Sequence, residues 1–343
     1  MKQRTLLLAA VFAASLVMVV GEAGAQPATG ARAGGAAGPA SPVLGTLEED
    51  PAPAELIRNS HYWVSNENAH DIWRSRISDL GGVQLAVGAD QVYVLAGWSR
   101  PEVLVPLDFD TAIRDLHRVY GALFVAASTR EAFVRLWSAA AADDVQAALV
   151  RTWGEAEGAR LLRTWRECHA RVGRRFQRMT ARYGRSGVPM FLTDDATYGF
   201  LRQLWVDGRV IPVRGDVTGE RALQSVARAA QGASLPVRLI YLSNVEQYIT
   251  YNPSFRRNVL ALPMDERSVV LRTRSMESLG FAEEGDEYHY NVQPGLNFQA
   301  WMRVNRVNEG RFLLRERSST GRQGLSEITR EPPVSTPAPQ IAN

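Results

Sequence analysis

The sequence predicts an α/β fold with a mainly parallel, Rossmann-like sheet. Short apolar runs alternate with amphipathic segments through the middle of the chain, which is the pattern of βαβ units. These runs end in small or polar residues, as strands do where they enter a turn at the carboxyl edge of a sheet. Between the second and third runs lie roughly a hundred residues with helical periodicity, too many for one crossover helix. The expected architecture therefore includes a large helical insertion after the second strand.

The predicted strands of the parallel sheet are residues 83–87, 103–107, 210–213 and 237–242. The stretch 220–230 is compatible with a helix, so the last two strands flank a βαβ unit. Residues 269–273 and 288–304 follow, the latter with a turn at Pro294-Gly295. They predict a pair of antiparallel strands at the edge of the sheet.

The helical insertion is expected over about residues 111–208. Apolar residues at spacings of three and four predict a helix near 113–124 and the longest helix over 161–183. Asp194 is typical of a helix N-cap, and the helix that it begins is expected to stop at Gly208.

The first 25 residues have the order of a secretory signal peptide. Lys2 and Arg4 precede an apolar run over 6–20, and Ala23-Gly24-Ala25 provides a small-residue cleavage site. The run is shorter than the roughly 20 residues of a membrane-spanning helix, so cleavage near Ala25 would leave no stable span. The expected product is periplasmic or secreted.

The regions flanking the domain differ from it in composition. After the signal peptide at 1–25, residues 26–55 are mainly Ala, Gly, Pro and Ser and predict a disordered leader. The α/β domain is expected over 56–317, and residues 318–343 are expected to form a flexible tail.

The composition also limits which kinds of binding partner are expected. A net charge of +3 gives no global field that would recruit nucleic acid, so none is expected. The five histidines are scattered, with no pair four residues apart, and no metal is expected. The expected partner is an unidentified small molecule, and the sequence does not indicate an oligomeric state.

The candidate site follows from the strand ends, because ligands of doubly wound sheets bind there. A glycine after the first strand lets backbone amides approach a ligand, and a carboxylate after the second can accept hydrogen bonds from ribose hydroxyls. Alternatively, these residue types occur because βα turns favour them whatever the function. The candidates are Gly88, Asp90, Asp108, Gly215, Asp216, Ser243 and Asn244.

Several motifs carry a resemblance to known proteins: Ser65-Asn66-Glu67, Val87-Gly88-Ala89-Asp90-Gln91, Tyr120-Gly121-Ala122-Leu123-Phe124, Gly215-Asp216 and Ser243-Asn244-Val245-Glu246-Gln247-Tyr248. They are similar to those of an uncharacterised bacterial family with a class I S-adenosylmethionine-dependent methyltransferase-like fold. The resemblance covers roughly residues 56–300 and implies a methyltransferase-type sheet. Such methyltransferases usually carry an acidic residue and two or three glycines around the first turn, whereas this chain has Gly88 alone.

The resemblance implies S-adenosylmethionine as the cofactor. Gly88 would lie near its methionine end, Asp108 at the ribose and Asp216 at the adenine, while Asn244 and Glu246 would lie near the transferred methyl. The implied cofactor-binding set is Gly88, Asp90, Asp108, Gly215, Asp216 and Ser243.

A second constellation comes from the residues themselves. Asn66, Glu67, Asn244 and Glu246 could meet as a polar cluster at the carboxyl edge, where burial would raise the pKa of a glutamate such as Glu67 and make it a base. The alternative is that they are helix caps and solvent-facing polar groups.

Two functions remain open beside a third, an enzyme without a cofactor, which rests only on the possible carboxylate cluster. One is an exported protein that binds an adenosyl-type cofactor and transfers a methyl group. The other is an exported, non-enzymatic binding protein that keeps the fold without the cofactor site. The second predicts a polar-walled pocket with no room for adenine beside Asp216.

Overall fold

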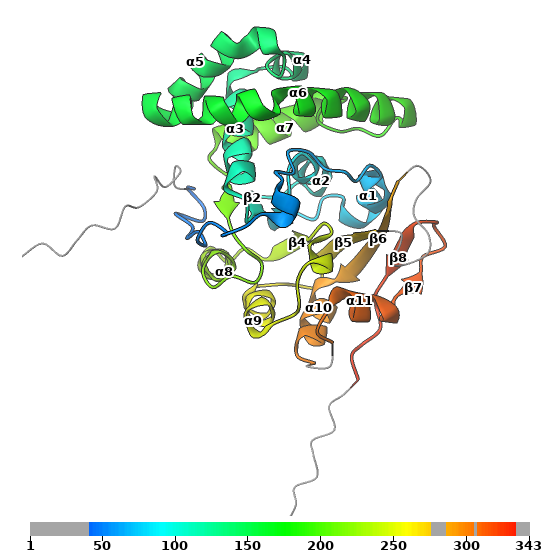
Figure 1. Cartoon of the computed structure of the whole chain (residues 1–343). Helices are drawn as coiled ribbons and strands as arrows, with labels where there is room; N and C mark the ends of the chain where they lie inside the picture. Colours follow the sequence, from blue (N-terminus) through cyan, green and yellow to red (C-terminus); the bar gives the residue numbers. More distant parts are fainter. Residues whose placement is uncertain (1–40, 276–285, 305–306, 334–343) are drawn as a thin grey trace, which may run out of the picture. The chain divides into compact units, whose positions relative to one another are not determined.

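The computed structural model describes residues 41–275, 286–304 and 307–333 (Figure 1). Within these residues the centre is an eight-stranded sheet with the order β3-β2-β1-β4-β5-β6-β8-β7. Strands β1 to β5 are parallel to one another, β6 is antiparallel to β5, and β8 is parallel to β6 and antiparallel to β7. The strands are β1 (Val83–Val87), β2 (Val103–Asp108), β3 (Val213–Arg214), β4 (Val237–Tyr241), β5 (Val269–Ser275), β6 (Tyr288–Pro294), β7 (Ser318–Ser319) and β8 (Leu325–Glu327). The order 3-2-1-4-5 is that of a Rossmann-like sheet, and the predicted fold class is confirmed.

Helices cover both faces of this sheet. The α-helices are α1 (Arg74–Ile77), α2 (Gln91–Ser99), α3 (Thr111–Ala126), α4 (Arg130–Arg135), α5 (Ala142–Trp153), α6 (Glu155–Ser186), α7 (Asp195–Val206), α8 (Ala222–Gly232), α9 (Pro253–Ala261), α10 (Gly295–Met302) and α11 (Gly310–Leu313). Short 3-10 helices occur at Ile57–Asn59, His70–Trp73, Ala139–Ala141, Val245–Gln247 and Leu314–Glu316.

The side chains of the central strands β1 and β2 alternate between two cores. Ala86 and Leu104 face the core that contains α1, α2 and the helices α3 to α7. Leu85 and Val105 face the opposite core, which contains α8, α9 and α10. A strand that is buried on both faces needs apolar residues at every position, which explains the continuous apolar runs seen in the sequence.

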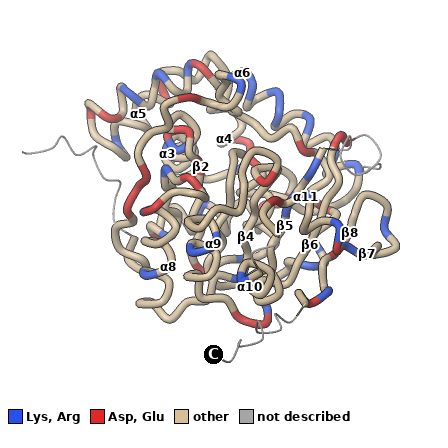
Figure 2. The backbone as a smooth tube through the Cα atoms, turned by 60° about the horizontal axis from the view of Figure 1, so that its bottom comes forward, with Lys and Arg blue, Asp and Glu red and all other residues tan. Residues whose placement is uncertain are grey.

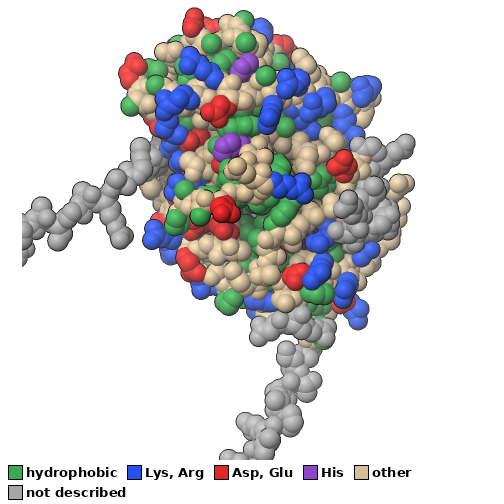
Figure 3. All heavy atoms as spheres, viewed as in Figure 1, with side chains coloured by type: hydrophobic (Ala, Val, Ile, Leu, Met, Phe, Trp, Pro, Cys, Tyr) green, Lys and Arg blue, Asp and Glu red, His purple; other side chains and the backbone are tan. Residues whose placement is uncertain are grey.

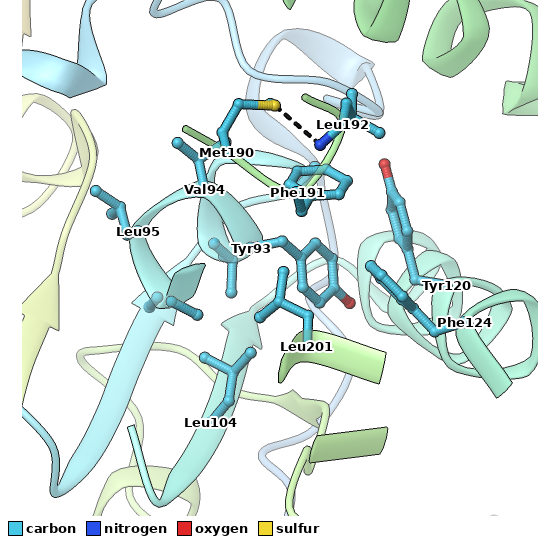
Figure 4. Close-up of a cluster of buried hydrophobic side chains, with 14 of the residues drawn as sticks. Tyr93, Val94, Leu95, Leu104, Tyr120, Phe124, Met190, Phe191, Leu192 and Leu201 are labelled. Carbon is cyan, nitrogen blue, oxygen red and sulfur yellow. Dashed lines mark hydrogen bonds between the residues drawn. The ribbon is translucent and has the colours of Figure 1, made fainter. Parts of the chain in front are cut away.

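The predicted helical insertion is present between β2 and β3 as helices α3 to α7. Figure 4 shows its aromatic core, in which Tyr93 of α2 faces Tyr120 and Phe124 of α3. The long helix α6 buries the apolar stripe that the sequence predicted, including Cys168 and Phe176. Its basic residues are visible along the tube in Figure 2, and basic side chains gather over this part of the surface in Figure 3.

Two predicted elements differ from the structure. The third strand begins later than expected, at Val213, and Val210 makes only an isolated bridge to Leu104. The amide of Ile211 donates to Leu104 and that of Gly215 to Asp108, and between these bonds Pro106 of β2 has no N–H to donate to Ile211, so the ladder is interrupted there. Strands β5 and β6 form the expected antiparallel pair, but the chain after Pro294 is helix α10, whose Phe298 and Trp301 are buried at a helical spacing of three.

The folded unit is longer at both ends than predicted. Residues 41–53 were expected in the leader, yet Leu44 and Leu47 are buried in the core beside α8. Residues 318–328 were expected in the tail, yet they contain β7 and β8 and bury Ile328 completely. Single apolar residues in stretches of polar composition account for both differences.

Among the described residues no helix is long and apolar enough to cross a membrane. The proposed signal peptide lies outside the described residues.

Candidate functional site

A pocket of about 600 Å³ lies at the carboxyl edge of the sheet, where the strand order reverses between β1 and β4. The register pairs Val87 with Leu107 and Ala86 with Tyr241, so the residues that follow these strands leave the sheet side by side. Its lining includes Gly88, Asp108, Phe109, Asp110, Ser243, Asn244, Tyr248 and Tyr288. This is the place where doubly wound sheets bind their ligands.

Gly88 begins the turn at the end of β1. Its φ of 101° favours glycine, and a Cβ at this position would lie 2.2 Å from Nε2 of Gln91. The amide of Gly88 donates to the carbonyl oxygen of Leu107 over 3.3 Å, and the amide of Ala89 donates to Oε1 of Gln91 over 3.0 Å. The first two backbone N–H groups of the glycine turn, those of Gly88 and Ala89, are therefore bonded within the protein.

His117 of α3 is hydrogen-bonded to the same turn. Its Nε2 lies 2.7 Å from the carbonyl oxygen of Gly88, and its Nδ1 lies 2.9 Å from the hydroxyl of Tyr93. A carbonyl oxygen can only accept, so Nε2 carries the proton and Nδ1 accepts from Tyr93. Burial lowers the pKa of His117 to about 4, and the ring is neutral at pH 7. The helical insertion is thus hydrogen-bonded to the turn that lines the pocket.

Asp108 at the end of β2 is half-buried in the pocket wall. Burial and the charge of Asp110 raise its pKa to about 7, although the amides of Phe109 and Asp110 act against this shift. Oδ1 of Asp108 accepts from the amide of Asp110 over 2.9 Å. Near neutral pH the raised pKa favours the protonated form of Asp108 more than that of an ordinary aspartate, and the protonated acid can both donate and accept hydrogen bonds.

Asp110 itself is buried next to the pocket. Its Oδ1 caps α3 by accepting from the amide of Ala112, and its Oδ2 lies 2.7 Å from Nδ1 of His61. His61 lies between Ser60 and Tyr62, which both line the pocket. This pair therefore holds the segment after residue 56 against the open end of β2.

Glu67 lies beneath the pocket and is completely buried. Its oxygens accept from the hydroxyls of Ser243 (2.7 Å), Thr273, Tyr241 and Ser65 (3.4 Å), and from Nε2 of His70 (3.1 Å). Burial raises the pKa of Glu67, but the bond and charge of His70 and the hydroxyls of Thr273 and Tyr241 outweigh it and hold that pKa below its ordinary value. The predicted raised pKa is therefore wrong, and the carboxylate orients its neighbours because its acceptor positions are filled.

Ser243 and Asn244 follow β4 and line the pocket. Ser243 has a φ of 50°, an uncommon backbone conformation for a residue with a side chain, and its hydroxyl is tied to Glu67. Asn66 donates to the hydroxyl of Tyr288, and Nδ2 of Asn244 lies 3.5 Å from the same hydroxyl. Three of the four residues of the predicted polar cluster thus meet at this edge: Asn66, Glu67 and Asn244.

The fourth, Glu246, does not join them. Its Oε2 accepts from Nε of Arg272 over 2.6 Å, and the hydroxyl of Tyr251 donates to Oε1. Arg272 also donates to the side chains of Asn291 and Gln293 on β6. This ion pair is buried between β5 and its neighbours and does not line the pocket.

Asp90 also lies outside the pocket. Its Oδ2 accepts from Nε of Arg175 on α6 over 2.9 Å, and its Oδ1 accepts from the amide of Ser65 over 2.7 Å. Arg175 further donates to the carbonyl oxygen of Glu67 and to the side chain of Asn68. Asp90 therefore joins the insertion, the turn after β1 and the segment that carries Glu67.

Gly215 and Asp216 end β3 away from the pocket. A Cβ at Gly215 would lie 2.4 Å from Leu107, and the exposed carboxylate of Asp216 accepts from the amide of Thr218. The buried carboxylate of Asp50 accepts from the amide of Asp216 over 3.1 Å. A residue of the predicted leader, Asp50, thus lies against the backbone of Asp216, whose carboxylate is exposed outside the pocket.

Sequence reasoning missed Gln91, Asp110, His61 and Tyr288. Asp110 had a usable signal, since an aspartate directly before a helical pattern is typical of an N-cap. No signal in the sequence marked Tyr288, because 222 residues separate it from Asn66 and only the folded sheet brings the two residues together. No group of three His, Cys, Asp or Glu residues that could hold a metal occurs in the described part of the chain.

The fold and this site define a Rossmann-like α/β protein with a pocket at the carboxyl edge of its sheet. The chain belongs to a family described as a domain of unknown function (DUF7790), whose model matches residues 62–329. No curated protein matches the chain. Among solved structures it is similar to the rRNA methyltransferase aviRa from Streptomyces viridochromogenes, with 12% identity, coverage of 68% of this chain and 79% of that chain, and a TM-score of 0.27. The fold assignment therefore rests on the strand order.

Proposed function

We propose that this protein binds a small adenosyl-type molecule, such as S-adenosylmethionine, in the pocket at the carboxyl ends of β1, β2 and β4. The observation that carries the proposal is that Gly88 and Asp108 end neighbouring strands on the wall of one pocket of about 600 Å³. That volume lies in the range of small-molecule sites. A carboxyl group at the end of the second strand is the usual partner of ribose hydroxyls in this fold.

Binding is proposed rather than methyl transfer. Of the residues that the resemblance implies near the transferred methyl, Glu246 lies in a buried ion pair outside the pocket. Glu67 accepts five hydrogen bonds and has a lowered pKa, which leaves it a weak base. Asn244 is the remaining polar candidate on the pocket wall.

A non-enzymatic binding protein for a different small molecule is the second candidate. Two observations favour it: Gln91 closes the glycine turn, and Asp216 lies away from the pocket beside Asp50. In this case the pocket would keep its polar wall, but it would have no binding site for adenine at the end of β3.

Calorimetry with the purified protein separates these candidates. We expect S-adenosylmethionine, S-adenosylhomocysteine or adenosine to bind, and Asp108→Asn to weaken binding at least tenfold. The matched control Asp216→Asn makes the same change at the neighbouring strand end outside the pocket and should leave affinity unchanged. If none of the three ligands gives heat at millimolar concentration, the adenosyl proposal is wrong and the second candidate stands.

We further propose that the protein is exported after cleavage near Ala25. Lys2 and Arg4, the apolar run and the small residues at 23–25 support this. N-terminal sequencing of the protein from a periplasmic or medium fraction should begin at Gln26. A full-length product that stays in the cytoplasmic fraction would overturn the proposal of export. The protein would then have access to the cytoplasmic pool of S-adenosylmethionine.

A further inference from the structure

The outer face of α6 carries a row of arginines, which is visible along the tube in Figure 2. Its members follow one another at spacings of three and four residues, so they lie along one side of the helix. At a rise of about 1.5 Å per residue, the row is about 21 Å long. The apolar stripe of α6 is buried on the other side of the helix. This basic row consists of Arg171, Arg174, Arg178, Arg182 and Arg185.

The guanidinium groups of the basic row lack the partners that other surface arginines have. Four of the five, all except Arg182, are exposed and make no ion pair or hydrogen bond with another described residue. By contrast, the exposed Arg228 of α8 is paired with Glu48. No acidic residue occurs in the sequence between Glu167 and Asp194, so this part of the helix supplies no counter-charge of its own.

Repulsion within the basic row costs free energy. Neighbouring members lie three or four residues apart, and like charges at these spacings destabilise a helix. The helix dipole favours cations in the last turn, which includes Arg185 but neither Arg171 nor Arg174. A partner that brings anionic groups to the row would remove this repulsion.

The surroundings of the basic row narrow the kind of anionic partner. Helix α5 packs beside α6 and carries the exposed Asp143 and Asp144, so a flat anionic membrane laid across both helices would also meet these carboxylates. The exposed residues between the arginines, which include Gln177, Thr180 and Ala181, are neither aromatic nor large and apolar. The face therefore lacks side chains that stack on bases or enter a bilayer.

We propose that the basic row of α6 is a docking surface for an extended acidic polysaccharide, whose carboxylates lie along the helix. A linear polymer presents its charges in a line, as the row does, and guanidinium groups bind carboxylates through paired N–H donors. Asp71 contacts both Arg182 (3.4 Å) and the partly exposed Arg322 (3.8 Å), so the basic surface continues beyond the helix. The described lining of the pocket includes no residue of α6, so this surface is tested independently of the pocket.

The test compares an oligogalacturonate, which has one carboxylate on each sugar, with its methyl ester, which has the same backbone without the charges. Calorimetry at pH 7 with the purified protein should show binding of the acid and none of the ester. Binding of the acid should weaken at least tenfold between about 50 and about 200 mM salt, because it releases counterions. Equal binding of the acid and the ester, or no binding of either, would overturn the proposal.

Variants locate the docking surface. The double substitution Arg174→Gln with Arg178→Gln should weaken binding of the oligogalacturonate at least tenfold. The control, Arg303→Gln with Arg315→Gln, removes the same charge from exposed residues on elements that pack on the other face of the sheet, and it should bind as the unaltered protein does. An equal loss in both double variants would show attraction by net charge alone and contradict the assignment to α6. Thermal unfolding checks that the variants fold, and the single changes Arg174→Gln and Arg315→Gln are compared if a double variant does not.

Two other polyanions distinguish the kind of partner. Vesicles of phosphatidylglycerol and a duplex DNA oligonucleotide are measured at the same salt concentration, and we expect neither to bind more tightly than the oligogalacturonate. Tenfold tighter binding of the vesicles or the DNA, lost in Arg174→Gln with Arg178→Gln, would overturn the polysaccharide and assign the basic row to that partner instead.

Discussion

At the scale of single residues, Asp108 makes stability depend on pH. Its pKa is about 7 in the folded protein and lower in the unfolded chain, so the folded state binds the proton more tightly. Asp108 therefore contributes to the free energy of unfolding at low pH, and this contribution is lost as the pH rises from about 4 to 7. The charged or titratable groups around it are Asp110 with His61, Arg214 in register on β3, and Arg58 on the pocket wall.

Asp108→Asn should therefore stabilise the protein at pH 8 and have little effect at pH 4, because asparagine resembles the protonated acid. We expect a gain of about 1–2 kcal/mol, less than the full shift would give, because the side chain is partly exposed. Urea unfolding at both pH values measures this gain. The control Asp216→Asn should show no such pH dependence, and an equal effect of both variants would count against the raised pKa.

At the scale of elements, one ion pair fastens the helical insertion to the turn after β1. The side chains of Asp90 and Arg175 are 0% and 3% exposed, and Arg175 also bonds the segment that carries Glu67. Arg175→Met would leave the Asp90 carboxylate buried without its partner and should cost about 3–5 kcal/mol in urea unfolding. The neighbouring exposed Arg174→Met should change stability by less than about 0.5 kcal/mol. Similar losses in both variants would show that the ion pair does not fasten α6.

The segment before residue 54 is fastened by a different carboxylate. Asp50 accepts from the backbone amides of Asp216, Glu220 and Arg221 at the entrance to α8. Asp50→Ala would leave these donors without that partner, and we expect a loss of about 2–3 kcal/mol in thermal or urea unfolding. Glu48→Ala removes an exposed ion pair with Arg228 instead and should be nearly neutral. If Asp50→Ala is equally neutral, the segment is not part of the stable fold.

At the scale of the whole molecule, the sequence predicts the centre of the sheet well because β1 and β2 are buried on both faces and β4 nearly so. The runs at β1, β2 and β4 were therefore visible as continuous apolar segments, and the capped helix after Asp194 was visible from its N-cap. The two ends of the folded domain were less predictable from the sequence. Leu44 and Ile328 are isolated apolar residues in polar stretches, and only the folded core shows that they are buried.

The site was predictable where it follows strand ends and unpredictable where it depends on packing. Gly88, Asp108, Ser243 and Asn244 meet in the pocket because the ends of neighbouring parallel strands must lie together. Asp90 and Glu246 also follow strands, but each faces a buried arginine, Arg175 or Arg272, on an element distant in sequence. No local pattern records which partner a carboxylate meets across the fold.

The most direct test of the pocket's role is a crystal structure of the protein grown with S-adenosylmethionine or adenosine. We predict ligand density in the pocket at the ends of β1, β2 and β4, with a ribose hydroxyl within hydrogen-bond distance of the Asp108 carboxyl group. An empty pocket at millimolar ligand, or a ligand bound elsewhere on the protein, would contradict the proposed adenosyl site.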